Sequence, residues 1–194
     1  MAPSPPRHPD WDRLFELAAG QEGLFTTQQA AEVGYSPQLL VHHVRAGRVR
    51  RIRRGIYRLV HFPAGENEDL VAVWLWSERQ GVFSHQTALS LHGLSDVLPS
   101  RIHLTLPEAW RRRRLRVPPG VVRHHADVAS NERAWIGSVT VTSPVRTLRD
   151  CSDEHLSPEL LLHAVYEAVI RGLVAKADVA DISRALAPYD RLEP

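Results

Sequence analysis

The first part of the chain has apolar residues at helical spacing in three short segments. Residues 11–19 place an apolar residue every three to four positions and end at a glycine, which predicts an amphipathic helix. A second helix is predicted to begin after Thr26, because Gln29 three positions later completes a capping box, and to run through Val33. A tight turn at Gly34 follows and separates this helix from the third.

The third helix is predicted between Ser36 and Gly47. Ser36 is a favoured N-cap, and Pro37 takes the first helical position, where its missing N–H costs nothing. The face expected to pack into the core consists of Leu40, Val41 and Val44. The face expected to lie in the major groove consists of Gln38, His42 and Arg45. Gln38 could bond an adenine edge and Arg45 a guanine or a phosphate, whereas His42 and His43 could equally be ordinary solvent-exposed residues.

A hairpin is predicted directly after the third helix. Residues 50–53 and 56–59 have the pattern of two strands, and Gly55 at the turn supplies the positive φ that a tight hairpin needs. Short helices joined by a tight turn and followed by a basic hairpin are typical of a winged helix-turn-helix. We place this domain at residues 10–62, after a proline-rich stretch, residues 1–9, that we expect to be a disordered tail.

The pattern beyond residue 65 predicts a second domain over residues 66–187. Helical spacing appears at residues 68–80, 84–92 and 160–173, and two Ser-Pro pairs begin helices at Ser143 and Ser157. Extended segments are predicted at residues 101–106, 120–125 and 136–142. The expected fold class is therefore α+β, with an N-terminal winged helix-turn-helix followed by a mixed α/β domain of a small sheet and several helices.

The distribution of charge along the chain indicates a function for the hairpin. Between Gly34 and Gly65 the chain has seven arginines and no acidic residue, although the whole chain has a formal net charge of only +2. A one-sided basic segment inside a winged helix indicates binding to double-stranded DNA. A solvated charged surface is the plainer alternative. The residues expected to contact DNA are Thr27, Gln28, Ser36, Gln38, His42, Arg45, Arg48, Arg50, Arg51, Arg53, Arg54 and Arg58.

A second basic cluster lies between two of the predicted strands of the second domain. It consists of Arg111, Arg112, Arg113, Arg114 and Arg116. The cluster is either a mobile, solvated loop or an additional contact to DNA or another polyanion. Trp110 beside it could stack on a base or anchor the loop.

Several segments resemble the AbiEi family of antitoxins. The resemblance extends over about residues 10–187 and is carried by residues 26–31, 49–58, 84–89, 92–94, 102–105 and 141–150. It implies a bacterial antitoxin encoded beside a nucleotidyltransferase-like toxin, which represses its own operon by binding inverted repeats through the winged helix. It also implies that the C-terminal domain carries the antitoxic effect, with or without a stable complex with the toxin. A solitary winged-helix regulator remains an alternative.

Within the last of those segments, Arg146 and Asp150 are a candidate motif of the antitoxin domain. Their spacing of four residues on a predicted helix is also that of an ordinary intrahelical ion pair, which we favour. The acidic composition of residues 126–194 would suit contact with a basic, nucleic-acid-handling toxin.

Other function classes are less well supported by the sequence. A DNA-binding domain fused to a nuclease-like domain would need the (D/E)xK triplet, but Lys176, the only lysine, follows Val174 and Ala175. The remaining signatures of metalloproteases, P-loops and hydrolases are absent, so we expect no enzyme activity. Four histidines could form a metal site in principle, but without paired cysteines or a matched carboxylate we expect neither a metal nor a cofactor. These are His85, His92, His124 and His125.

The expected location is the cytoplasm, in association with the nucleoid. Cys151 is the single cysteine, which rules out an internal disulfide and fits a reducing compartment. The longest apolar run, residues 70–76, is far shorter than a membrane span, and residues 1–9 lack the apolar core of a signal peptide. The expected partners are therefore operator DNA and a toxin, without a membrane.

Overall fold

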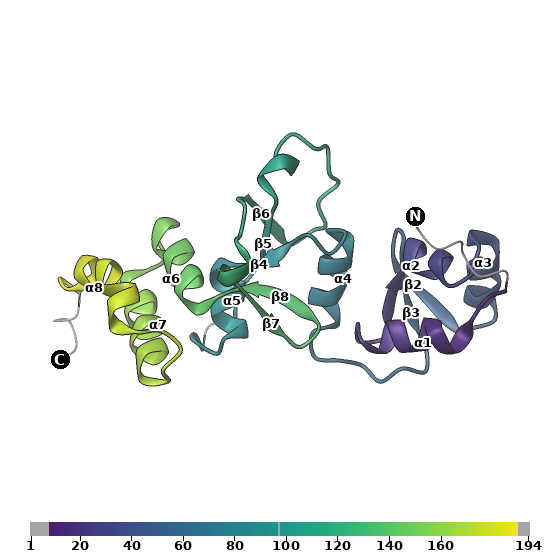
Figure 1. Ribbon diagram of the computed structural model, residues 1–194, viewed down its shortest axis with the longest axis horizontal. Helices are drawn as coiled ribbons and strands as arrows, with labels where there is room; N and C mark the ends of the chain where they lie inside the picture. The colour runs from purple at the N-terminus through teal and green to yellow at the C-terminus, as the bar shows by residue number, and fades with distance from the viewer. Residues whose placement is uncertain (1–7, 97, 190–194) are drawn as a thin grey trace. The chain divides into compact units, whose positions relative to one another are not determined.

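The computed structural model describes residues 8–96 and 98–189, and the chain forms two compact units, Met1–Arg79 and Gln80–Pro194 (Figure 1). The predicted tail lies outside the described residues except for His8 and Pro9. The first unit extends beyond the predicted winged helix to include helix α4 (Glu68–Trp76), which contacts strands of that unit. The division into functional domains at residues 62–66 stays a prediction.

The described residues of the first unit, from His8 on, form four helices and one small sheet. Its three strands are antiparallel in the order β1-β3-β2. Its elements in chain order are α1 (Trp11–Ala19), β1 (Leu24–Thr26), α2 (Thr27–Glu32), α3 (Pro37–Arg45), β2 (Val49–Arg53), β3 (Ile56–Leu59) and α4. This order of helices followed by a hairpin is that of a winged helix-turn-helix.

The local signals in the sequence explain where these helices begin. Thr26 Oγ1 accepts a hydrogen bond from the Gln29 backbone N–H at 3.1 Å, and the Gln29 side chain accepts one from the Thr26 N–H at 2.9 Å. The predicted capping box is thus present at α2. Gly34 has a φ of +90°, and a Cβ added there would lie 2.7 Å from the carbonyl oxygen of His8. Only glycine fits this turn between α2 and α3 without displacing the chain.

The prediction that Val41 packs into the core with Leu40 and Val44 is wrong. Val41 is 48% exposed, while Leu40 is fully buried and Val44 is partly buried. The inward face of α3 also includes His43, whose ring stacks on that of Trp11 with centroids 5.5 Å apart. The reason is helical periodicity: residues 40, 43 and 44 share one side of α3, and position 41 projects from the other.

The second unit contains a five-stranded mixed sheet in the order β6-β5-β4-β8-β7. The pairs β5–β6 and β4–β8 are parallel, whereas β4–β5 and β7–β8 are antiparallel. Its strands are β4 (Val82–Phe83), β5 (Ile102–Leu106), β6 (Val121–His125), β7 (Arg133–Ile136) and β8 (Val139–Thr142). Residues 136–142, predicted as one extended segment, instead span a hairpin that turns at Gly137, which has a φ of +56°.

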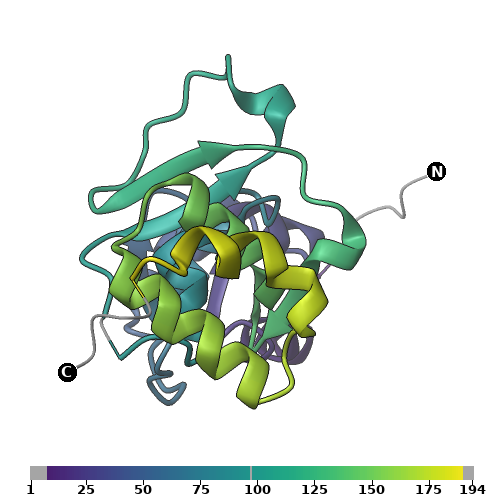
Figure 2. The same cartoon turned by 90° about the vertical axis from the view of Figure 1, so that its left-hand side faces the viewer.

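The described residues of the second unit also form four helices, three of them after the sheet. Figure 2 shows α6, α7 and α8 lying side by side. Buried residues from α5 through α8 form one apolar cluster that includes Leu148, Leu161 and Ile182. The helices are α5 (His85–Leu91), α6 (Pro144–Asp153), α7 (Pro158–Ile170) and α8 (Ala180–Leu186), with 3-10 turns η1 (Glu108–Trp110), η2 (Ser130–Glu132) and η3 (Lys176–Val179). The predicted α+β class, a winged helix followed by a mixed domain, is confirmed.

None of the helices in the described part of the chain combines the length and the apolar character that crossing a bilayer requires.

Candidate nucleic-acid interface

The outward face of α3 combines polar, charged and apolar side chains. Gln38, His42 and Arg45 are exposed, as predicted, and Val41 lies among them at helical spacing. Amide and guanidinium groups can each make two hydrogen bonds to a base edge, and a small apolar side chain can contact the thymine methyl group. The misassigned Val41 therefore adds a fourth candidate base contact to this face.

The aromatic packing behind α3 fixes its orientation. Trp11 stacks on His43, and Tyr35 meets the same imidazole edge-on with centroids 5.5 Å apart. Burial, with Arg48 and His42 acting in the same direction, lowers the pKa of His43. His43 thus packs against Trp11 and Tyr35 and is not part of the exposed face of α3.

The wing hairpin is tied to the second helix at its turn. The carbonyl oxygen of Gly55 accepts hydrogen bonds from the Thr27 N–H at 2.9 Å and from Thr27 Oγ1 at 3.4 Å. Gly55 has a φ of +76°, as a tight hairpin requires. Thr27, predicted to contact DNA, thus also has a structural role, since it fixes the wing turn against α2.

The arginines of the wing are presented in two ways. Arg50, Arg51 and Arg54 are exposed, while Arg53 is partly buried beside an irregularity in the β2–β3 register. Arg51 Nε donates to the carbonyl oxygen of Arg53 at 3.3 Å, which holds the Arg51 side chain along the hairpin. Arg45 and Arg48 are also exposed. Together with the four arginines of the wing, they form a group of six guanidinium groups that are accessible or partly accessible.

Arg58 was predicted to contact DNA, and this prediction is wrong. The residue is only 7% exposed, and its Nε lies 2.8 Å from Glu68 Oε2 in an ion pair with α4. Its other nitrogens donate to the carbonyl oxygens of Leu59 and Phe62 at 3.2 and 2.9 Å. The guanidinium is occupied by these acceptors and joins β3 to α4, because its position on the strand points inward.

Two further predicted contacts lie at the edges of this surface. Ser36 is exposed, but its hydroxyl accepts the Leu39 N–H at 3.2 Å as the N-cap of α3. Gln28 is also exposed and donates to the carboxylate of Glu32 at 3.3 Å. An acidic neighbour makes Gln28 a weaker candidate for a phosphate contact than the wing arginines.

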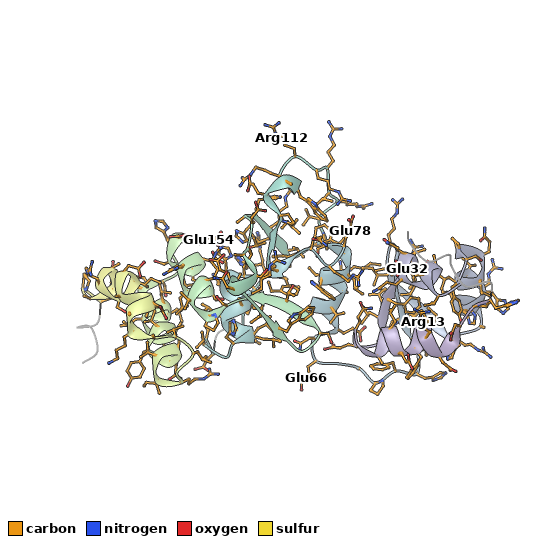
Figure 3. All side chains as sticks on the ribbon, in the orientation of Figure 1. Arg13, Glu32, Glu66, Glu78, Arg112 and Glu154 are labelled. Carbon is orange, nitrogen blue, oxygen red and sulfur yellow. The ribbon has the colours of Figure 1, made fainter. Side chains whose placement is uncertain are left out.

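The second basic cluster lies on the loop between the parallel strands β5 and β6, with Arg112 on the part that extends from the sheet (Figure 3). All five arginines are exposed, but part of their charge is already engaged. Arg111 pairs with Glu108, Nη2 to Oε2 at 2.8 Å, and the Arg113 guanidinium lies 4.2 Å from the centre of the Trp110 ring. Trp110 therefore contacts a side chain of its own loop.

The pair of Arg146 and Asp150 is part of an ion network inside the second unit. Arg146 Nε lies 2.7 Å from Asp150 Oδ1, and Arg146 Nη1 lies 2.8 Å from Glu132 Oε2. Burial raises the pKa of Asp150, although the Arg146 guanidinium acts in the opposite direction. The interpretation as an intrahelical ion pair is confirmed, and Glu132 extends it across the fold from η2 to α6.

An exposed polar helix next to a fixed basic hairpin defines the first unit as a winged helix-turn-helix, a class of DNA-binding domain. Residues 12–60 match the family model described as "Transcriptional regulator, AbiEi antitoxin". The resemblance to this family of antitoxin regulators is thereby confirmed over the winged helix.

Comparisons with individual proteins add little to this family match. No curated protein matches the sequence. Among solved structures, the RV2827C protein from Mycobacterium tuberculosis aligns with 82% of this chain and 72% of its own, at 19% sequence identity and a TM-score of 0.48.

Proposed function

We propose that this protein is an autorepressor that binds inverted repeats in its own promoter and is the antitoxin to a nucleotidyltransferase-like toxin. It acts in the cytoplasm, on the nucleoid. One observation supports the DNA-binding part of this proposal. The exposed face of α3, with Gln38 and Arg45, is followed by a wing whose arginines have no acidic residue near them in sequence. Phosphate contacts from the wing would supply affinity, and the α3 side chains would supply choice of sequence.

Two types of contact follow from this division. Gln38 and Arg45 are the candidates for hydrogen bonds to base edges, and Val41 for a thymine methyl group. Arg50, Arg51, Arg53 and Arg54 are the candidates for phosphates, since each lies on the wing hairpin. The buried Arg58 is excluded from both sets.

The antitoxin part of the proposal rests on the family of the winged helix and on the separate second unit. The second unit has its own core, formed by α5 to α8, and its own sheet, so it can carry a separate activity. Regulation and neutralisation would then be separable by mutation. In this proposal the protein acts without catalysing a reaction.

The experiment measures repression and rescue in the same cells. A reporter follows the protein's own promoter, while the neighbouring toxin gene is expressed from an independent promoter. Replacing Arg50, Arg51, Arg53 and Arg54 by alanine is expected to derepress the reporter and to leave rescue of growth intact. Well-expressed variants that lose rescue as well would overturn the separation of the two activities.

The alternative of a solitary regulator has a distinct outcome in this design. Wild-type protein would repress its promoter, but no adjacent gene would be toxic when expressed alone. A toxic nucleotidyltransferase-like neighbour whose effect disappears on co-expression of this protein would support the antitoxin assignment.

A further inference from the structure

Three histidines that are distant in sequence converge in the second unit. His85 is the first residue of α5, His103 lies on β5 and His124 lies on β6. Each presents a ring nitrogen, and the three nitrogens all lie within 4.8 Å of one another. His85 and His124 were among the four histidines predicted as possible metal ligands, with His92 and His125, whereas His103 was not predicted.

The strand register explains why these residues meet. β5 and β6 are parallel, with His103 opposite Val122 and Thr105 opposite His124. Since side chains alternate across a sheet, His103 and His124 project from the same face, and their positions along the paired strands differ by two residues. The backbone N–H of Ser84 donates to the carbonyl oxygen of His103 at 3.2 Å, which brings the start of α5 to that face.

A carboxylate completes the group. Glu154 lies at the end of α6 (Figure 3). Its Oε1 lies 3.1 Å from His124 Nδ1 and 4.0 Å from His85 Nε2, and its Oε2 lies 3.8 Å from His103 Nδ1. His103 Nδ1 also faces His124 Nε2 at 3.1 Å. Each of the three rings therefore has a nitrogen within reach of one carboxylate whose side chain is 43% exposed, while His85 is 7% exposed.

The hydrogen bonds around His85 leave one nitrogen for a ligand. Its Nδ1 lies 2.9 Å from Ser84 Oγ, and Thr105 Oγ1 donates to that same oxygen at 2.8 Å. A hydroxyl oxygen accepts two hydrogen bonds, so Nδ1–H of His85 can donate there and keep the Nε2 lone pair directed toward Glu154. Histidines that bind a metal through one ring nitrogen usually donate a hydrogen bond from the other nitrogen to a polar group.

We propose that His85, His103 and His124 bind a divalent transition-metal ion, with Zn²⁺ as the expected metal and Glu154 closing the site on its solvent side. Imidazole and carboxylate ligands suit Zn²⁺, and tetrahedral sites with bond lengths of about 2.0–2.1 Å place ligand atoms about 3.4 Å apart. His124 Nε2 lies 3.1 Å from His103 Nδ1, and the Glu154 oxygens lie 3.8 Å from His103 Nδ1 and 4.0 Å from His85 Nε2, on either side of that value. The ion joins α5, both parallel strands and the end of α6.

A cation also resolves the balance of donors and acceptors in the cluster. Three neutral imidazoles contribute three N–H groups and three lone pairs, and the carboxylate adds acceptors only. Burial lowers the pKa of each of the three histidines. Since the His85 and His124 rings stack with centroids 3.7 Å apart and planes at 20°, metal binding requires one of these rings to turn so that its lone pair meets the ion.

The test uses the full-length, tag-free protein, stripped with a chelator and titrated with Zn²⁺ and, separately, with Co²⁺. We expect about one equivalent of Zn²⁺ per chain, a higher unfolding temperature with Zn²⁺, and the visible absorption of tetrahedral Co²⁺. His103→Gln and His124→Gln should lose the Co²⁺ absorption and the stabilisation. His163→Gln, an exposed histidine on α7, should behave as wild type.

Glu154→Gln keeps the test decisive if the histidine variants fail to fold, because Glu154 is half-exposed and its replacement is nearly isosteric. Its Zn²⁺ affinity is expected to fall by about 10- to 100-fold. Stoichiometric binding that survives both folded histidine variants would overturn the proposal, as would a wild-type protein that takes up no Zn²⁺. Unchanged affinity in Glu154→Gln would remove the carboxylate from the site.

Discussion

The wing hairpin and the β5–β6 loop both carry a run of arginines, but the structure presents them differently. In the wing, strand pairing and the two hydrogen bonds from Thr27 to Gly55 fix the hairpin beside α3. In the loop, Arg111 pairs with Glu108 and Arg113 lies over Trp110, so part of the charge is neutralised or occupied within the loop. Equal arginine density therefore does not imply an equal binding surface.

The comparison shows what turns a basic run into a nucleic-acid interface. A fixed scaffold lowers the entropy lost on binding, and a polar helix face beside it can read bases. The wing has both features, because the hairpin is fixed and α3 exposes Gln38 and Arg45. We assign no such base-contacting helix to the β5–β6 loop. We therefore expect the arginines of the wing to contribute much more to operator affinity than those of the loop.

The largest expected effect is the loss of the wing charges. Replacing Arg50, Arg51, Arg53 and Arg54 by alanine removes four candidate phosphate contacts. Each contact contributes roughly 0.9 orders of magnitude near 0.1 M salt, so operator affinity should fall by about three to four orders of magnitude. Fluorescence anisotropy with labelled promoter DNA measures this. A loss of less than about tenfold would show that the wing does not lie on the DNA.

Arg58 should behave differently from its neighbours in the same run. Arg58→Ala leaves Glu68 without its partner and removes the donors to Leu59 and Phe62, which should destabilise the first unit by about 3 kcal/mol. Chemical denaturation monitored by tryptophan fluorescence checks this. Exposed Arg54→Ala is the matched control and should change stability by less than about 0.5 kcal/mol. Equal stabilities would mean that Arg58 is not held in the core.

The reading face of α3 should affect specificity more than affinity for random DNA. Gln38→Ala is expected to reduce the preference for the true operator by roughly 1–3 kcal/mol while binding to random DNA stays nearly the same. Competition with unlabelled random DNA separates the affinity for the operator from the affinity for random sequence. Equal losses on operator and random sequence would show that Gln38 does not contact a base.

The smallest effect is expected from the second basic cluster. Arg112, Arg114 and Arg116 are exposed, and their joint replacement by alanine should change operator affinity by less than about threefold, because this loop does not belong to the unit that holds α3 and the wing. The same anisotropy assay applies. A loss comparable to that of the wing variant would make the loop a second DNA-contacting surface and remove the contrast.

The sequence predicted the elements whose signals are local. The capping box of α2, the Ser-Pro starts of α3, α6 and α7, and the glycine turn of the wing each depend on a few adjacent residues, and each is present. The strand β4 was not predicted, because it has two residues and no periodicity to detect.

The errors at the candidate sites have a different origin. The inward position of Arg58 depends on Glu68 from a later helix, and the outward position of Val41 on how α3 packs against Trp11. His103 joins His85 and His124 only through the register of β5 and β6. Such long-range pairings are set by tertiary packing, so spacing along the chain does not reveal them.

The most direct test of the DNA-binding account is the salt dependence of operator affinity. For about five phosphate contacts, the slope of log K against log salt should be near −4 to −5 in the wild type. Removing Arg50, Arg51, Arg53 and Arg54 should flatten it by about three to four units, while the loop variant keeps the wild-type slope. An unchanged slope in the wing variant would contradict the assignment of the wing to the DNA backbone.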